Sequence, residues 1–187
     1  MPRVYVALIH HPVVNKRGEC IASAVTNLDL HDIARAVKTY GGLGFYVATP
    51  LTDQQALVEK IVSHWTTGIG GVHHPKRKSA LELIRMADTL EAVCEDIGRR
   101  EGEIPKTVVT SARQRGESLR FAGLRDMVEK DVPVLLVFGT AWGLAEEIMQ
   151  QADYTLMPIA SRTEYNHLSV RSAVAIVLDR LLGIDRE

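Results

Sequence analysis

The sequence predicts an α/β protein in which a mostly parallel sheet carries helices on both of its faces. Two observations support this fold class. Segments with the apolar pattern of strands alternate along the chain with segments of helical spacing. An unbroken run of apolar residues also follows Pro133, as is typical of a strand buried on both faces of a parallel sheet. No linker, repeat or low-complexity segment divides the 187 residues, so we expect residues 1–187 to form a single domain.

The first half of the chain is expected to hold two strands and three helices. In chain order these are a strand at 4–9, a helix at 28–40, a strand at 44–48, a helix at 52–64 and a helix at 76–98, with a polar segment at 10–18 and a glycine-rich loop at 65–75. Gly41 and Gly42 end the first helix. Thr52 and Gln55 have the spacing of a capping box for the second helix. The third helix is predicted from a single apolar face, which is formed by Leu83, Ala87, Leu90, Cys94 and Ile97.

The second half alternates strands and helices again. We expect a strand at 107–110, a helix at 117–130, a strand at 134–138, a helix ending near 151, a strand at 154–157 and a final helix from about Ser169. Parallel sheets bind ligands beyond the carboxyl ends of their strands, so the loops after Thr110, Phe138 and Met157 are expected to meet at one edge. The final helix is apolar on more than one face, which suits packing on the sheet and against a second subunit.

Composition and charge limit the classes of protein to which this chain can belong. No apolar run approaches the roughly 18 to 20 residues that cross a bilayer, and the N-terminus does not read as a signal peptide, so we expect a cytoplasmic protein. Cys20 and Cys94 are then expected to be free thiols. The net charge of -1 does not decide for or against nucleic acid, because RNA enzymes gather basic residues on one face.

Two basic patches are present in the sequence. One is the segment 73–78, and the other consists of Arg113, Arg115, Arg120 and Arg125. Each patch alone suits an ordinary solvated surface. The two patches together favour contact with phosphate groups.

Two loops in the C-terminal half have the features of ligand-binding loops. Gly139 and Gly143 bracket a turn between a strand and a helix, where backbone can approach a ligand closely and free N–H groups face it. Trp142 lies in this turn and suits a pocket wall better than a core position. The second loop joins a short strand to the final apolar helix. Side chains that would serve equally well as structural caps or as ligand contacts are Thr110, Ser111, Asn166 and Ser169.

Together, the two loops resemble the last two motifs of the SPOUT class of S-adenosylmethionine (SAM)-dependent RNA methyltransferases. The matching residues are Phe138, Gly139, Gly143 and Leu144 in the first loop and Asn166, Leu168, Ser169 and Val170 in the second. The resemblance is strong over residues 107–183, and it is closest to a small bacterial group found beside or fused to a tRNA guanine-N1 methyltransferase. It implies a SAM pocket formed by Thr110, Ser111, Phe138, Gly139, Thr140, Trp142, Gly143, Leu144, Ile159, Asn166, Leu168, Ser169 and Val170.

The same resemblance implies two features of architecture. The C-terminal segment would be threaded through a loop as a deep trefoil knot, although general rules of chain topology alone would argue against any knot. The protein would also be a homodimer, in which the second subunit completes the active site.

The segment Asn27 to Arg35 resembles the N-terminal motif of SPOUT ribose 2′-O-methyltransferases, in which an asparagine precedes a catalytic arginine. The segment is one residue shorter here and lacks the usual glycine, so the target atom stays open. The resemblance makes Asn27, His31 and Arg35 the catalytic candidates, and an ordinary ion pair on a helix surface is the alternative. Arg35 suits the positioning of an oxygen, because a guanidinium does not act as a base. The candidates for the base are His31, Asp32 and His167.

The function that follows from this resemblance is SAM-dependent methylation of tRNA or rRNA, at a ribose 2′-hydroxyl or at a base. The alternative is a catalytically silent partner that binds SAM or RNA beside another methyltransferase. A protein that binds NAD or FMN is disfavoured, because no G-x-G-x-x-G element follows the first strand. We expect no metal, because the histidine pairs at 10–11 and 73–74 have no cysteine or acidic residue at ligand spacing.

Overall fold

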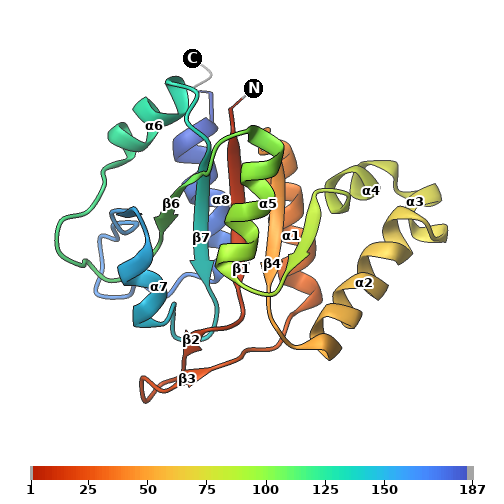
Figure 1. Ribbon diagram of the computed structural model, residues 1–187, viewed down its shortest axis with the longest axis horizontal. Helices are drawn as coiled ribbons and strands as arrows, with labels where there is room; N and C mark the ends of the chain where they lie inside the picture. The colour runs from red at the N-terminus through yellow and green to blue at the C-terminus, as the bar shows by residue number, and fades with distance from the viewer. Residues whose placement is uncertain (1, 185–187) are drawn as a thin grey trace.

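A computed structural model describes residues 2–184 and shows a six-stranded sheet at the centre of the molecule (Figure 1). The strand order is β5-β4-β1-β7-β6-β8, and each neighbouring pair is parallel. The strands are β1 (Val4–Ile9), β4 (Gly44–Ala48), β5 (Ile84–Ala87), β6 (Lys106–Val109), β7 (Val134–Gly139) and β8 (Tyr154–Thr155). The predicted parallel α/β sheet is therefore confirmed.

Helices cover both faces of this sheet. They are α1 (Asn27–Thr39), α2 (Thr52–Thr66), α3 (Ile69–His73), α4 (Pro75–Leu81), α5 (Leu90–Glu101), α6 (Phe121–Glu129), α7 (Glu146–Gln151) and α8 (Val170–Leu182). Helices α1 and α8 pack side by side on one face, and α5 and α7 lie on the other (Figure 1). Within residues 2–184, none of these helices is both long and apolar enough to span a lipid bilayer.

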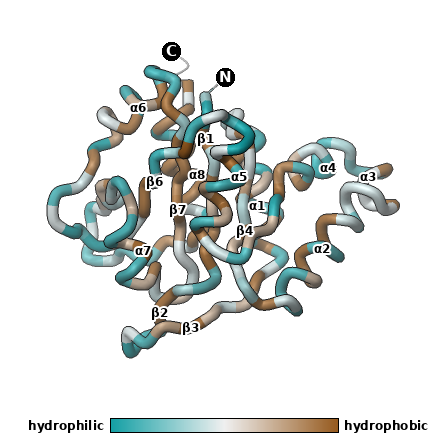
Figure 2. Tube along the Cα trace, in the orientation of Figure 1, coloured by the Kyte–Doolittle hydropathy of each residue, from teal (hydrophilic) through white to brown (hydrophobic). Residues whose placement is uncertain are grey.

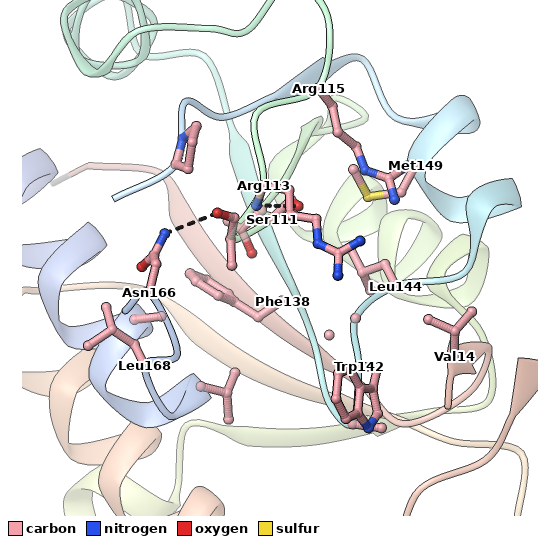
Figure 3. Close-up of a pocket in the computed structure, with 18 of the residues that line it drawn as sticks. Val14, Ser111, Arg113, Arg115, Phe138, Trp142, Leu144, Met149, Asn166 and Leu168 are labelled. Carbon is pink, nitrogen blue, oxygen red and sulfur yellow. Dashed lines mark hydrogen bonds between the residues drawn. The ribbon is translucent and has the colours of Figure 1, made fainter. Parts of the chain in front are cut away.

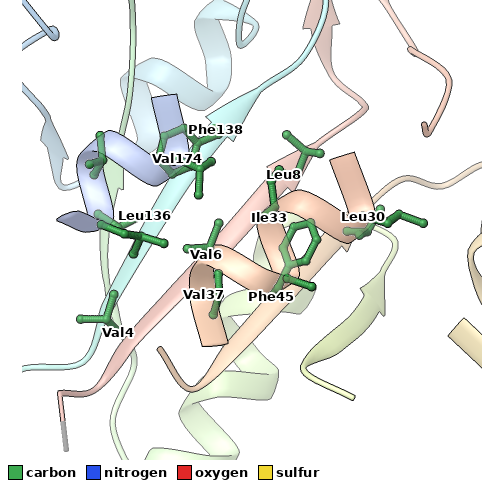
Figure 4. Close-up of a cluster of buried hydrophobic side chains, with 14 of the residues drawn as sticks. Val4, Val6, Leu8, Leu30, Ile33, Val37, Phe45, Leu136, Phe138 and Val174 are labelled. Carbon is green, nitrogen blue, oxygen red and sulfur yellow. The ribbon is translucent and has the colours of Figure 1, made fainter. Parts of the chain in front are cut away.

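The central strands have continuous apolar sequences because both of their faces are buried. Successive side chains of β1 point to opposite faces: Val4, Val6 and Leu8 join the cluster under α1 and α8 (Figure 4), whereas Tyr5, Ala7 and Ile9 join the cluster under α5 and α7. Figure 2 shows hydrophobic residues along β7 in the middle of the molecule. The tip of the segment 13–21, which extends away from the sheet, is hydrophilic (Figure 2). The sheet thus separates two apolar cores.

An ion pair joins the first helix to the last. Asp29 is only 6% exposed, and its Oδ1 accepts a hydrogen bond of 2.8 Å from Nη1 of Arg171. Its Oδ2 accepts a second hydrogen bond of 2.6 Å from the hydroxyl of Thr26, which caps α1. A buried carboxylate without such partners would be costly, so this pair fixes how α8 sits against α1.

The predicted helix at 76–98 is wrong. Helix α4 ends at Leu81, β5 occupies 84–87, and α5 begins at Leu90 after the capping residue Thr89. The side chain of Thr89 accepts a hydrogen bond of 3.2 Å from the amide of Ala92. Parallel pairing of β5 with β4 at the edge of the sheet outweighs the helical spacing of the local sequence, because tertiary contacts can override local preference.

Three smaller expectations also change. Thr52 is the first helical residue of α2 rather than its cap, and Gln55 donates hydrogen bonds to the carbonyl oxygen of Thr49 and to Asp88. The polar segment at 10–18 belongs to an antiparallel hairpin of β2 (Val13–Val14) and β3 (Cys20–Ile21). The loop at 65–75 contains the short helix α3.

Candidate functional site

A pocket of about 740 Å³ opens at the carboxyl ends of β6, β7 and β8 (Figure 3). The loops that follow these three strands form most of its wall, which confirms that they meet at one edge of the sheet. All residues predicted to bind SAM line this pocket except Thr140 and Ser169.

The first loop is shaped by the close approach of its own backbone. Gly143 has a φ of +119°, and its amide donates a hydrogen bond of 3.0 Å to the carbonyl oxygen of Thr140. A Cβ atom at Gly139 would lie 2.7 Å from the amide nitrogen of Leu144. Gly139 is therefore required for the loop to close on itself, whereas the sequence had suggested only the close approach of a ligand.

The hairpin β2–β3 forms a wall of the pocket that the sequence did not predict. The amide of Val14 donates to the carbonyl oxygen of Gly143 at 2.9 Å, and the amide of Trp142 donates to the carbonyl oxygen of Val14 at 3.0 Å. The hairpin tip brings Asn15 and Lys16 to the pocket. Its sequence signal was the turn from Asn15 to Gly18 between two short apolar pairs, because asparagine and glycine favour such turns.

The other two loops are bonded to each other. The side-chain amide of Asn166 donates a hydrogen bond of 3.0 Å to the carbonyl oxygen of Ala112, and the amide of Arg113 donates to the hydroxyl of Ser111 (Figure 3). Asn166 therefore ties two walls of the pocket together and does not cap a helix. Ser169 is the cap of α8, and its hydroxyl accepts a hydrogen bond of 3.3 Å from the amide of Ser172.

Thr140 lies outside the pocket for a similar reason. Its hydroxyl donates a hydrogen bond of 3.1 Å to the carbonyl oxygen of Ile9 and contacts the hydroxyl of Ser23. The side chain of Ser23 in turn contacts Nδ1 of His10, a fully buried histidine. Thr140 therefore joins the end of β7 to the end of β1.

Basic side chains from two segments lie at the pocket. Arg115 makes an ion pair of 2.6 Å with Glu146, and this hydrogen bond lowers the pKa of the Glu146 carboxyl. Arg113 and Lys16 also line the pocket, and within residues 2–184 neither makes an ion pair. This excess of positive charge attracts anionic groups such as carboxylates and phosphates.

The catalytic candidates on α1 do not line this pocket. Asn27 is exposed at the first turn of α1, and His31 places its ring 5.3 Å from that of Trp65. Arg35 is exposed and lines a second cleft beside α3 and α4. Burial lowers the pKa of His31, and the nearby cations Arg77 and Arg35 lower it further.

The three candidates for the base divide between two places: His31 and Asp32 are neighbours on α1, and His167 lies in the loop before α8. Asp32 pairs with Arg171 of α8 at 3.4 Å. Of the three, His167 alone lines the pocket, where its ring lies 5.4 Å from that of Tyr165. Within residues 2–184, no group of three or more histidine, cysteine, aspartate or glutamate side chains is placed to hold a metal ion.

The pocket fits an adenosyl cofactor in size and chemistry. Its volume lies in the range of small-molecule sites, which combine apolar walls with a few polar groups. Phe138, Leu144 and Leu156 supply apolar surface, and Ser111 and Asn166 supply polar groups. The fold and the pocket thus match the class of α/β proteins whose nucleotide-like cofactors bind at the carboxyl edge of a parallel sheet.

Sequence comparison identifies the family. Residues 3–183 match the profile of a family described as SAM-dependent RNA methyltransferase, and the chain belongs to this family. Over 180 residues it is 46% identical to a tRNA (guanine-N(1)-)-methyltransferase of Oleidesulfovibrio alaskensis and 49% identical to a protein of the same name from Nitratidesulfovibrio vulgaris. Each match covers 96% of this chain but only 42% of the relative, so the chain spans about two fifths of their length.

A shorter relative and two solved structures extend the comparison. An uncharacterized protein of Aquifex aeolicus is 38% identical, with 98% of this chain and 90% of the relative covered. A TrmH/SpoU tRNA modifying enzyme of A. aeolicus has a similar fold, with a TM-score of 0.58 at 17% identity over 97% of this chain and 75% of that one. An AdoMet-bound rRNA methyltransferase of Sinorhizobium meliloti has a TM-score of 0.53 at 22% identity, covering 95% of this chain and 55% of that one. At 17% and 22% identity, these two structures show that the fold is similar and no more than that.

Replacing Gly139 by alanine should destabilise the protein. The new methyl group would press on the backbone of Leu144, and overpacking of this kind costs about 1 to 3 kcal/mol. Urea unfolding measures the loss. The matched control is Gly123→Ala in α6, where the new methyl group would meet only the end of the Leu119 side chain and alanine favours the helix. Equal stability of the two variants would show that the loop is not closed as described.

Proposed function

We propose that the protein methylates tRNA, with SAM bound in the pocket between the three strand-end loops. The observation that carries this proposal is the meeting of the two SPOUT-like loops in one pocket at the carboxyl edge of the sheet. The tRNA substrate is supported by the names of the two relatives that match 96% of the chain. Those relatives are more than twice as long as this chain, so their names support tRNA as the substrate and do not assign their whole activity to this chain.

Methyl transfer depends mainly on positioning. SAM supplies an electrophilic methyl group on its sulfonium centre. Phe138, Leu144 and Leu156 would exclude water from one side of the reacting groups, and Arg113 and Lys16 would hold the anionic groups that approach. Alignment of the reacting groups contributes at best about 7 to 11 kcal/mol, so this rigid, hydrogen-bonded pocket is suited to the reaction.

The location of the candidates on α1 supports a homodimer. Asn27, His31 and Arg35 lie outside the pocket of their own chain, so a second copy of the chain would have to bring them to it. In that arrangement, Arg35 would orient a phosphate or the accepting oxygen. His31, whose pKa is lowered, would be neutral and able to accept a proton. His167, already at the pocket, is the alternative base.

We also propose that the C-terminal segment is knotted. The amide of Leu156 donates to the carbonyl oxygen of Val109, and the amide of Met157 donates to that of Leu119, each at 2.9 Å. The chain at 155–157 is thus held between the two ends of the loop 109–119. Helix α8 then packs beside α1. Passage through the loop 109–119 would produce the trefoil that the family resemblance implies.

A second candidate function is a silent partner that binds SAM or RNA without methyl transfer. The observations that favour it are the shortened Asn27 to Arg35 segment and the position of Arg35 outside the pocket. This function predicts SAM binding without turnover, so an activity measurement distinguishes the two.

Incubation with labelled SAM and RNA from a strain that lacks the gene should transfer label to the tRNA fraction. Mass spectrometry of the digested nucleosides then identifies the product, and fragmentation separates methylation of the base from methylation of the ribose. RNA from the wild-type strain, which already carries the modification, is the control. Tight SAM binding with no labelled nucleoside would support the silent partner instead.

Replacing Arg35 by alanine should abolish transfer and leave SAM affinity nearly unchanged, because Arg35 lies outside the SAM pocket. The control is Lys38→Ala, which removes an exposed cation one turn further along α1. Co-expression of Arg35→Ala with Gly139→Val, whose larger side chain would distort the β7 loop and block SAM binding, tests the dimer. About half of the dimers should pair the two variants and have one intact site, which gives about one quarter of wild-type activity. If Arg35 served the pocket of its own chain, the mixture would be inactive.

Mechanical pulling tests the knot. When the molecule is stretched from residues 2 and 184, a tightened trefoil should stop the chain short of its full length of about 3.3 to 3.6 Å per residue. Pulling between residues 2 and 151 is the control, because the segment that would thread the loop lies beyond that point. Extension to full length in both measurements would show that the chain is unknotted.

A further inference from the structure

A second cleft, of about 420 Å³, lies beside α1, α3 and α4, and its lining residues are mostly basic. They are Arg35, His73, His74, Pro75, Lys76 and Arg77, and we call this site the basic cleft. Helices α2 to α4 extend to one end of the molecule, whereas α7, which supplies Glu146 and Met149 to the SAM pocket, lies toward the other (Figure 1). The basic cleft is therefore separate from the SAM pocket of the same chain.

Two residues of the basic cleft, Arg77 and His74, pack against one aromatic side chain, that of Trp65. The guanidinium of Arg77 lies 4.6 Å from the centre of the Trp65 ring. The rings of His31 and His64 meet it edge-on at 5.3 and 5.1 Å, and the ring of His74 lies at 6.0 Å. One arginine and three histidine side chains thus surround the half-buried Trp65.

Two glycines hold α3 against this tryptophan. A Cβ atom at Gly70 would lie 2.8 Å from the Trp65 ring, and one at Gly71 would lie 2.4 Å from the Trp65 carbonyl oxygen. Any larger residue would push α3 away, and His73 and His74 would move with it. Packing therefore fixes the backbone that carries His73 and His74.

The cations of the basic cleft are not neutralised by the protein. Within residues 2–184, none of Arg35, Lys76 and Arg77 makes an ion pair. Asp32, the acid on the adjacent turn of α1, pairs with Arg171 instead. Burial is the main cause of the lowered pKa of His31, and the positive charges of Arg77 and Arg35 lower that pKa further. Such a cluster repels itself, and a bound anion would offset that repulsion.

We propose that the basic cleft binds the phosphate backbone of the RNA substrate, outside the SAM pocket. This inference rests on the proposed RNA methyltransferase function and names the surface that holds the substrate. Lysine and arginine contact phosphates, and arginine planes also stack on unpaired bases. Arg35 lines the basic cleft and is also the main catalytic candidate, so RNA held there would run directly past the residue assigned to the chemistry.

The test measures binding of a fluorescently labelled, unmodified tRNA transcript by anisotropy at several salt concentrations. The variant Lys76→Gln/Arg77→Gln should bind more weakly, and its slope of log affinity against log salt should fall by about one unit for each lost phosphate contact. SAM affinity should stay at the wild-type value. Because Arg77 packs on Trp65, the single variant Lys76→Gln is measured as well; its side chain is exposed, and it should lose about half of the effect.

The matched control is Arg99→Gln/Lys130→Gln, which removes two exposed cations from α5 and from the end of α6. Asp96 keeps its partner Arg100 in this control. It should keep the wild-type salt slope. Wild-type salt slopes for the cleft variants, or an equal loss of slope in the control, would overturn the proposal that the basic cleft binds RNA. Either result would leave the proposed methyltransferase function intact. If the wild-type protein binds no RNA at all, both proposals fail.

Discussion

The pocket depends on the way one short segment is held between two others. The amides of Leu156 and Met157 donate hydrogen bonds to the carbonyl oxygens of Val109 in β6 and of Leu119 beyond the next loop, and the amide of Leu119 donates to the carbonyl oxygen of Thr155. Because the two partners are ends of the same loop, this pairing brings the segments 110–120 and 156–169 to one place. The bond from Asn166 to Ala112 then locks them together. The β7 loop joins them because β7 lies next to β6 in the sheet.

The elements that could be predicted from the sequence are those in which burial is complete. Strands β1, β4 and β7 are covered on both faces, so their sequences are apolar throughout and only a strand explains them. Strand β5 lies at the sheet edge with all four of its residues half-buried, and its mixed sequence also fits a helix. The hairpin β2–β3 has two residues in each strand and depends on bonds to the Gly143 loop, which no local pattern reveals.

The same distinction applies to the site. Phe138, Gly139 and Leu144 line the pocket because the end of β7 fixes their position along the chain. Thr140 and Ser169 have equally suitable hydroxyl groups, but those groups already bond to Ile9 and Ser172. The sequence placed Arg35 on a helix, and the structure confirms that helix as α1. It did not reveal the neighbours of Arg35, because α4 packs directly on α1 and α3 is held by the packing of Gly70 and Gly71 on Trp65.

The wide spacing of the pocket residues also determines when the pocket can form. Its walls extend along the chain from Val14 in the hairpin to Val177 in α8. A chain emerging from the ribosome would complete most of its sheet before the last wall exists. A pocket for the methyl donor would therefore form only after α8 has been synthesised, and a product truncated before α8 would lack part of the cavity wall.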